Sequence, residues 1–258
     1  AVPHAAHRTA PPAGTPRYLV IADAVSDAQE GLLWLLRDVW PAVRALGGPA
    51  HAVVESKAPT AVPFKLTLNG AGWRRFMKLG RGASPEREGG WLGEVSQSLY
   101  ERLVDLRRAG ELDIEHLDHE PLRDIDATPY ADTLTALATL NGARALLLPR
   151  LRNETAAASP VWGEPRPEAA AMARGVPVVS TTAAAPSLFR APRGGADSST
   201  CGFALGDDVA GFARAAAALL DVASWEKQSR LASSCARTRL TPAEVDLAWT
   251  EVLAEALS

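Results

Sequence analysis

The chain has 258 residues, of which 47% are hydrophobic and 22% charged, so it can bury a sizeable core as an ordinary globular protein. Its formal net charge of -3 and its scattered arginines give no sign of the basic stripe that nucleic-acid-binding proteins carry. No run approaches the ~20 apolar residues that a membrane-spanning helix needs, so we expect no membrane span and a cytoplasmic location.

The two cysteines, Cys201 and Cys235, are too few for a disulfide scaffold. No Cys-x-x-Cys motif indicates zinc or redox chemistry. We therefore expect both cysteines to be buried packing residues. Residues 1–16 are rich in proline and alanine and lack the apolar core of a signal peptide, which predicts a disordered linker before a single domain over 17–258.

The domain begins with a strand and an amphipathic helix. Arg17–Asp23 is a short apolar run that suits a buried strand. The next helix contains Pro41, where we expect a kink, because proline lacks the backbone N–H and clashes with the preceding turn. A second strand is predicted at Ala50–Ser56. The apolar stripe of the helix consists of Leu32, Leu36, Val39, Trp40, Val43 and Leu46.

A variable insertion is expected over 57–90. Residues 62–68 have the composition of an edge strand. Basic side chains then gather beside Trp73, and they either contact a phosphate or a membrane or form a solvated loop. The members of this basic cluster are Arg74, Arg75, Lys78 and Arg81.

Helices and strands alternate through the rest of the chain. The remaining predicted strands are Ile114–Asp118, Ala143–Pro149, Pro177–Thr181 and Cys201–Leu205, and the helices run over 91–109, 130–141 and 168–173 and begin near 208, 224 and 242. Since each strand is a continuous apolar run, the pattern predicts an α/β fold with a doubly wound parallel sheet covered on both faces. Ligands of such sheets bind beyond the carboxyl ends of the strands.

The most informative of these carboxyl-end loops precedes the helix that starts at Pro167–Glu168. Free backbone amides in the first turn of a helix can hold a diphosphate, and Glu168 is placed to accept hydrogen bonds from a ribose diol. Proline and glutamate are also favoured in any first helical turn, so an ordinary helix start remains an alternative.

The sequence EAAAMARGVPVVST, residues 168–181, resembles the EAMACGVPVVAT signature of glycosyltransferases group 1. That signature belongs to the carboxyl-terminal domain of retaining transferases with two facing Rossmann-like domains. Further segments resemble other blocks of the same domain in the same order. They are residues 32–46, 114–120, 140–151 and 202–232.

The resemblance implies a GT-B-type nucleotide-sugar-binding half that transfers a hexose from a UDP- or GDP-linked sugar to an unknown acceptor. The acceptor would be held by an amino-terminal domain missing from this chain. Neither a cofactor nor a metal is expected, because in this family cationic side chains and a helix end stabilise the leaving diphosphate.

The resemblance also implies roles for individual residues. Glu168 would bind the ribose, with Asp118 and His119 beside the base. Ala169 and Ala170 would offer backbone amides to the diphosphate. The donor-sugar pocket would be lined by Trp162, Gly163, Glu164 and Pro165, and the diphosphate would be neutralised by Arg166 or else by Arg150 or Arg152.

Three departures from the family pattern bear on activity. The first glutamate of the paired-glutamate motif would fall at Pro160, which has no carboxylate. The loop over 22–29 carries two acids where phosphates would lie, and the diphosphate-binding lysine has no clear counterpart. Losing such groups costs several kcal/mol of transition-state stabilisation. Two alternatives follow: a hexosyltransferase domain with a degenerate catalytic motif, or a catalytically inactive scaffold or interaction domain.

Overall fold

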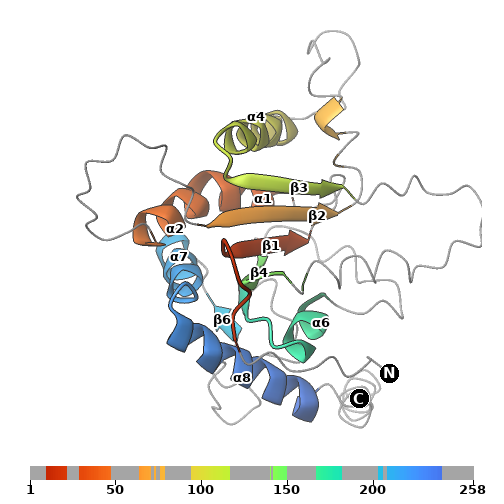
Figure 1. Cartoon of the computed structure of the whole chain (residues 1–258). Coiled ribbons are helices and arrows are strands. Elements are labelled where there is room, and N and C mark those ends of the chain that lie inside the picture. The colour runs from red at the N-terminus through yellow and green to blue at the C-terminus, as the bar shows by residue number, and fades with distance from the viewer. Residues whose placement is uncertain are drawn as a thin grey trace, which may run out of the picture.

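The described part of the chain is built around one parallel sheet (Figure 1). A computed structural model describes residues 10–21, 29–47, 64–70, 73, 76–78, 94–116, 140, 142–149, 167–181, 203–205 and 208–239. Within these ranges six strands form a single sheet in which every neighbouring pair is parallel. The strands are β1 (Arg17–Ile21), β2 (Lys65–Gly70), β3 (Leu112–His116), β4 (Ala145–Leu148), β5 (Val178–Ser180) and β6 (Phe203–Leu205).

The strand order is β3-β2-β1-β4-β5-β6. The chain therefore starts at the centre, builds outward through β2 and β3, and then returns to build β4 to β6 on the other side of β1. This is the order of the doubly wound sheets that bind dinucleotides, with its reversal between β1 and β4. The predicted α/β fold with a doubly wound parallel sheet is confirmed at this level.

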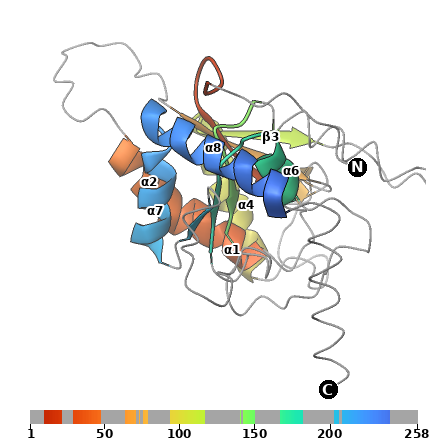
Figure 2. The ribbon, with the colours of Figure 1, turned by 90° about the horizontal axis from the view of Figure 1, so that it is seen from below.

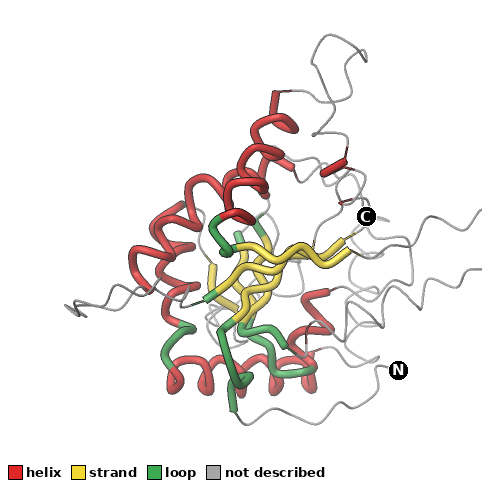
Figure 3. Tube along the Cα trace, turned by 45° about the horizontal axis from the view of Figure 1, so that its top comes forward, coloured by secondary structure: helices red, strands yellow, loops and turns green. Residues whose placement is uncertain are grey.

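Helices cover both faces of the sheet, whose strands form the central layer in Figure 3. The helical segments are α1 (Gln29–Trp34), the π-helical η1 (Leu35–Val39), α2 (Trp40–Gly47), α4 (Glu94–Arg108), α6 (Pro167–Ala173), α7 (Val209–Ala218) and α8 (Val222–Arg239). None of these described helices is both long enough and apolar enough to cross a bilayer.

Alternation along the strands divides the core between the two faces. Tyr18 and Val20 of β1 join a larger buried cluster with α1, η1, α2, α4 and α7. Leu19, between them, points to the other face and joins a smaller cluster with α6 and α8. Figure 2 shows α6 and α8 side by side over that second face.

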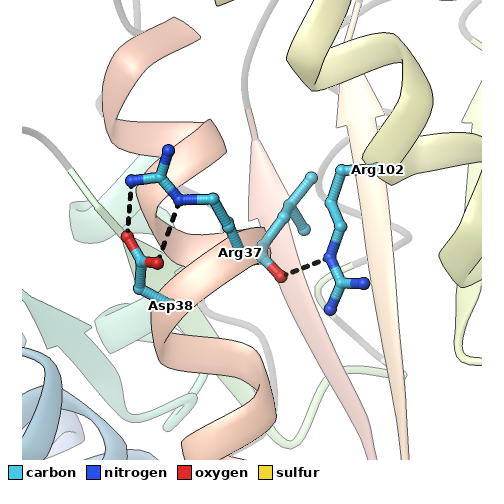
Figure 4. A network of polar contacts seen from close by, with 4 residues as sticks. Arg37, Asp38 and Arg102 are labelled. Atoms are coloured by element: carbon cyan, nitrogen blue, oxygen red, sulfur yellow. Dashed lines mark hydrogen bonds and ion pairs between the residues drawn. The ribbon is translucent and has the colours of Figure 1, made fainter.

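Pro41 is accommodated by a π-helical turn. The N–H of Trp40 donates to the carbonyl of Leu35, five residues back, and Pro41 has no N–H to donate. The carbonyl of Leu36 therefore receives a hydrogen bond neither from the N–H of Trp40 nor from residue 41. Arg102 of α4 fills this position, its Nε donating to the Leu36 oxygen at 2.9 Å (Figure 4). The distortion predicted at Pro41 is thus a local π-helical segment that fixes where α4 packs.

Replacing Arg102 with methionine should lower the free energy of unfolding by about 1.5 kcal/mol, because the Leu36 carbonyl loses its charged donor. In a Pro41→Ala background the same change should cost clearly less, since residue 41 then supplies a backbone N–H. Urea unfolding of the four variants in this double-mutant cycle measures the coupling.

Arg37→Met is the matched control for this cycle. Arg37 is 62% exposed and only pairs with the neighbouring Asp38 (Figure 4), so its loss should leave the urea midpoint unchanged. Additive effects of Arg102→Met and Pro41→Ala would contradict the explanation.

Arg144, just before β4, contacts the turn between α7 and α8. Its Nε and Nη2 donate to the carbonyls of Leu219 and Leu220 at 2.6 and 2.8 Å, and its guanidinium lies 5.6 Å from the ring centroid of Trp225. Trp225 Nε1 donates in turn to the Arg144 carbonyl at 2.7 Å. Burial lowers the pKa of the Arg144 guanidinium. These contacts attach the α7–α8 turn to the amino end of β4.

Tyr18 makes a second buried attachment to α7. Its hydroxyl donates to the carbonyl of Ala216 at 2.7 Å, and burial raises the pKa of the phenol above its ordinary value. The neutral, donating form is therefore the stable one at ordinary pH. Together with the Arg144 contacts, this bond holds the carboxyl-terminal part of α7 over the centre of the sheet.

Three sequence predictions about packing need correction. Leu46 is 54% exposed, because Gly47 takes the inward position after Val43 and lies against Phe64 and Leu220. The strand that includes Leu66 and Leu68 is not an edge strand, because β2 pairs with both β1 and β3. The strand predicted at Ala50–Ser56 lies outside the described residues.

The third correction concerns Cys235, and Trp73 bears on the basic cluster for which two alternatives were open. Trp73 is buried and packs edge-to-face on Phe76, so it does not form a surface site with the exposed Lys78. Arg74, Arg75 and Arg81 lie outside the described residues. Cys235 is buried as expected, but it is also disulfide-bonded, which the sequence analysis did not predict.

Candidate functional site

The fold places a candidate site at the carboxyl edge of the sheet, where the strand order reverses. β1 and β4 are parallel neighbours, with Val20 opposite Leu147, and the connections leave them in opposite directions along the sheet. A crevice at such a reversal is where ligands of open α/β sheets bind. α6 is the first described element after β4, and it packs beside β5 and α8.

Local sequence explains why α6 forms and stops where it does. Pro167 occupies the first helical position, where a missing N–H costs nothing. Gly175 ends the helix with φ +72°, a conformation that residues with a Cβ rarely adopt. Its N–H donates to the Met172 carbonyl and that of Val176 to the Ala171 carbonyl, both at 2.9 Å. The glycine of the ARGVP segment is therefore a helix stop.

Glu168 lies in the first turn of α6 and is only 8% exposed. A carboxylate is rarely buried unless hydrogen bonds compensate for its lost hydration. Ala170, Ala171 and Met172, which follow it, are buried in the smaller core cluster with β4, β5 and α8. The packing of this apolar side of α6 therefore fixes the orientation of the helix and of Glu168.

Two buried hydroxyl side chains at the end of β5 were not singled out from the sequence. Ser180 and Thr181 are both almost inaccessible to solvent. Ser180 Oγ donates to the Thr181 carbonyl at 2.8 Å, and the N–H of Thr181 donates to the Leu148 carbonyl at 3.2 Å, at the end of β4. The signal in the sequence is an apolar strand that ends in two hydroxyl residues at a carboxyl end.

A buried arginine closes the other end of α6. Arg174 Nη1 donates to the carbonyl of Ala170 at 3.2 Å, and burial lowers the pKa of its guanidinium. Arg174 follows the last residue of α6, and a cation at the carboxyl end of a helix interacts favourably with its free carbonyls. This residue supports the helix from the end opposite to Glu168.

The structure describes only part of the predicted site. Glu168 and Ala170 are buried, and Ala169 lies between them in α6. The alternative phosphate partners Arg150 and Arg152 lie outside the described residues. The other predicted site residues that lie outside the described residues are Asp118, His119, Trp162, Gly163, Glu164, Pro165 and Arg166.

Among the described residues, no three His, Cys, Asp or Glu side chains are grouped so that they could hold a metal ion. The sequence does contain one Asp-x-Asp pair, Asp124 and Asp126, so the expectation of no metal gains no support from the lack of such a motif, and both residues lie outside the described residues. Carboxylates at this spacing are common ligands of hard divalent cations.

Comparison with known proteins adds no family assignment: no family model matches the chain, and no curated protein is significantly similar to it. What is established is the class of fold, a parallel α/β sheet with helices on both faces and the strand order of Rossmann-like proteins.

Proposed function

We propose that this chain is the nucleotide-sugar-binding half of a two-domain, GT-B-type glycosyltransferase. The single observation that carries the proposal is the burial of Glu168 in the first turn of α6, the first described element after β4. The sequence resemblance assigns ribose binding to this carboxylate. A buried, oriented carboxylate suits that role, because both ribose hydroxyls can donate to its two oxygens.

In this proposal the donor lies along the carboxyl edge of the sheet. The ribose binds Glu168, and the diphosphate meets the backbone amides of Ala169 and Ala170 at the start of α6. Trp162 to Pro165 contact the sugar, Arg166 neutralises the diphosphate, and Asp118 and His119 lie beside the base. The acceptor is bound by an amino-terminal domain of the parent protein.

A second candidate function is a catalytically inactive scaffold with the same fold. The observation that favours it is Pro160 at the position of the first glutamate of the paired motif. Without that carboxylate, the positive charge that develops on the sugar loses a stabilising partner. This alternative predicts no saturable nucleotide affinity, or an affinity that does not depend on Glu168.

A cytoplasmic location is not part of the proposal. The disulfide at Cys235 bears on the location directly.

Calorimetric titration of UDP, GDP and ADP into the chain tests the two candidates. One nucleotide should bind saturably to the wild-type chain. Glu168→Ala should weaken it at least ~10-fold, because hydrogen bonds to a charged acceptor contribute about 1.5–3 kcal/mol. Glu168→Gln, which keeps the shape and one acceptor oxygen, should lie between the two.

Glu101→Ala is the matched control for the titration. Glu101 is an exposed carboxylate in α4, on the other face of the sheet, and accepts a hydrogen bond from Gln97. Its loss should leave nucleotide affinity unchanged. Absence of binding by all three nucleotides at millimolar concentration, with the wild-type chain folded, would refute the donor-site proposal and favour the scaffold.

A further inference from the structure

The disulfide at Cys235 is a feature of the described structure that the proposed function does not use. Cys235 lies in the carboxyl-terminal half of α8, is 4% exposed and is disulfide-bonded. The sequence contains one other cysteine, Cys201, which lies outside the described residues and two positions before β6. We propose that Cys201 and Cys235 form an intrachain disulfide that attaches the sheet edge to α8, and that the protein works in an oxidising compartment.

Burial of Cys235 favours an intrachain partner. Its side chain belongs to the smaller core cluster, with Ala232 and Ala236 of the same helix and with Leu146 and Val178 of the sheet. A cysteine of a second copy would have to enter this packed layer to reach the sulfur. Cys201 is the other cysteine of the sequence, so a bond to it requires no second copy of the chain.

The place of the bond in the fold gives it a structural role. β6 is at the end of the strand order, has three residues and pairs with β5 alone. Trp225 packs the amino-terminal part of α8 into the larger cluster, but the rest of α8 faces the second cluster with small side chains, which bury little apolar area. These small buried residues of α8 are Ser229, Ala232, Ser233, Cys235 and Ala236. A covalent bond between the edge and the helix compensates for this weak packing.

Forming the bond requires an oxidant of the disulfide class. The thiolate of one cysteine attacks a disulfide RSSR and releases one thiolate RS⁻, which leaves a mixed disulfide on the chain. The second cysteine thiolate attacks the chain sulfur of that mixed disulfide and releases a second RS⁻. The two protons lost by the cysteines convert both leaving groups to RSH, so two thiols of the chain are oxidised while one RSSR is reduced.

Such a bond points to where the protein works. Disulfides form and persist in oxidising surroundings, whereas the reducing thiols of the cytosol keep most cysteines reduced. A buried bond within a core cluster is shielded from those thiols once formed, so it acts as a permanent structural link. This inference opposes the cytoplasmic location expected from the sequence, and it does not depend on nucleotide binding.

Thiol counting on the purified full-length chain tests the bond itself. The chain, denatured without reductant, should incorporate no maleimide, and after reduction it should incorporate two labels and migrate as the same monomer. Two labels without reduction would overturn the proposal. A dimer that only reductant dissociates would overturn it as well.

Thermal unfolding then tests the structural role. Reductant should lower the midpoint of the wild-type chain by ~10 °C, the shift expected when a loop of this length in a protein of this size loses its cross-link. The double variant Cys201→Ala, Cys235→Ala should unfold at that lower midpoint, and reductant should not shift it further. An unchanged unfolding midpoint of the wild-type chain after complete reduction would contradict the proposal that the disulfide stabilises the attachment of the sheet edge to α8.

Thiol trapping in the cells that produce the protein tests the compartment. Rapid acid quenching followed by alkylation with a polymer-linked maleimide should leave the chain without an added tag. Tagging at both cysteines would show a reduced chain in the cell and would refute the inferred location.

Discussion

Replacing Arg144 with methionine should lower the free energy of unfolding by about 3 kcal/mol. The carbonyls of Leu219 and Leu220 each lose a charged donor, and an acceptor left without its partner in a buried site costs about 1–3 kcal/mol. The cation over the Trp225 ring is lost as well. Methionine keeps the length of the side chain, so the loss reports the polar contacts more than a cavity. Urea unfolding measures it.

Arg214→Met is the control for the Arg144 prediction. Arg214 is an exposed arginine of α7, and its replacement should leave the urea midpoint unchanged. A shift for Arg144→Met no larger than that of the control would show that the guanidinium does not attach the α7–α8 turn. Because Arg144 lies at the amino end of β4, opposite the candidate site, the folded variant should bind nucleotide as the wild-type chain does.

Replacing Trp40 with alanine should cost about 3–5 kcal/mol of unfolding free energy. The Trp40 ring is inaccessible to solvent and packs edge-to-face on Tyr18 and Phe64, with ring centroids 5.9 and 5.4 Å away. Its Nε1 also donates to Glu111 at 3.2 Å. Removing the ring leaves a cavity at the centre of the larger cluster, which close-packed neighbours fill only partly.

Trp40→Phe separates packing from the hydrogen bond. Phenylalanine keeps most of the aromatic contact but cannot donate a hydrogen bond to Glu111. The Glu111 carboxylate keeps its ion pair with Arg44. Its cost should be less than half that of Trp40→Ala. Equal costs for the two variants, measured by urea unfolding, would contradict an origin in ring packing.

Continuous apolar runs were sufficient to predict most of the sheet. The runs at Arg17–Asp23, Ala143–Pro149 and Pro177–Thr181 contain β1, β4 and β5, because strands buried on both faces need apolar side chains at every position. β2 was misjudged because Lys65, Thr67 and Asn69 alternate with its leucines. That alternation is typical of an edge, but β2 pairs with both β1 and β3, and Thr67 is buried.

Other misses arise from contacts between segments that are distant in sequence. A proline within an apolar stripe indicates a distortion, but only the Arg102 bond to Leu36 shows how the helix continues as a π-helical turn. The stripe continues through the buried Trp40 and Val43, but extrapolating it to Leu46 fails, because Gly47 takes the next inward position. The cysteine spacing carries no information about pairing, and the disulfide at Cys235 appears only in the fold.

The candidate site was predictable only in its local part. Glu168 and the helix start at Pro167 belong to one contiguous segment, so local sequence indicated both, whereas the glycine stop at Gly175 was not predicted. Ser180 and Thr181 reach the same edge of the sheet through the pairing of β5 with β4, which local sequence does not encode.

Hydrogen–deuterium exchange of the full chain, with and without saturating UDP or GDP, tests the central claim most directly. If this edge binds a nucleotide sugar, one nucleotide should slow exchange in α6 and at the carboxyl ends of β1 and β4, where the strand order reverses. Exchange at the amino ends of the same strands should not change. No protection of α6 by either nucleotide, or protection confined to the amino ends, would contradict the proposal that this edge binds a nucleotide sugar.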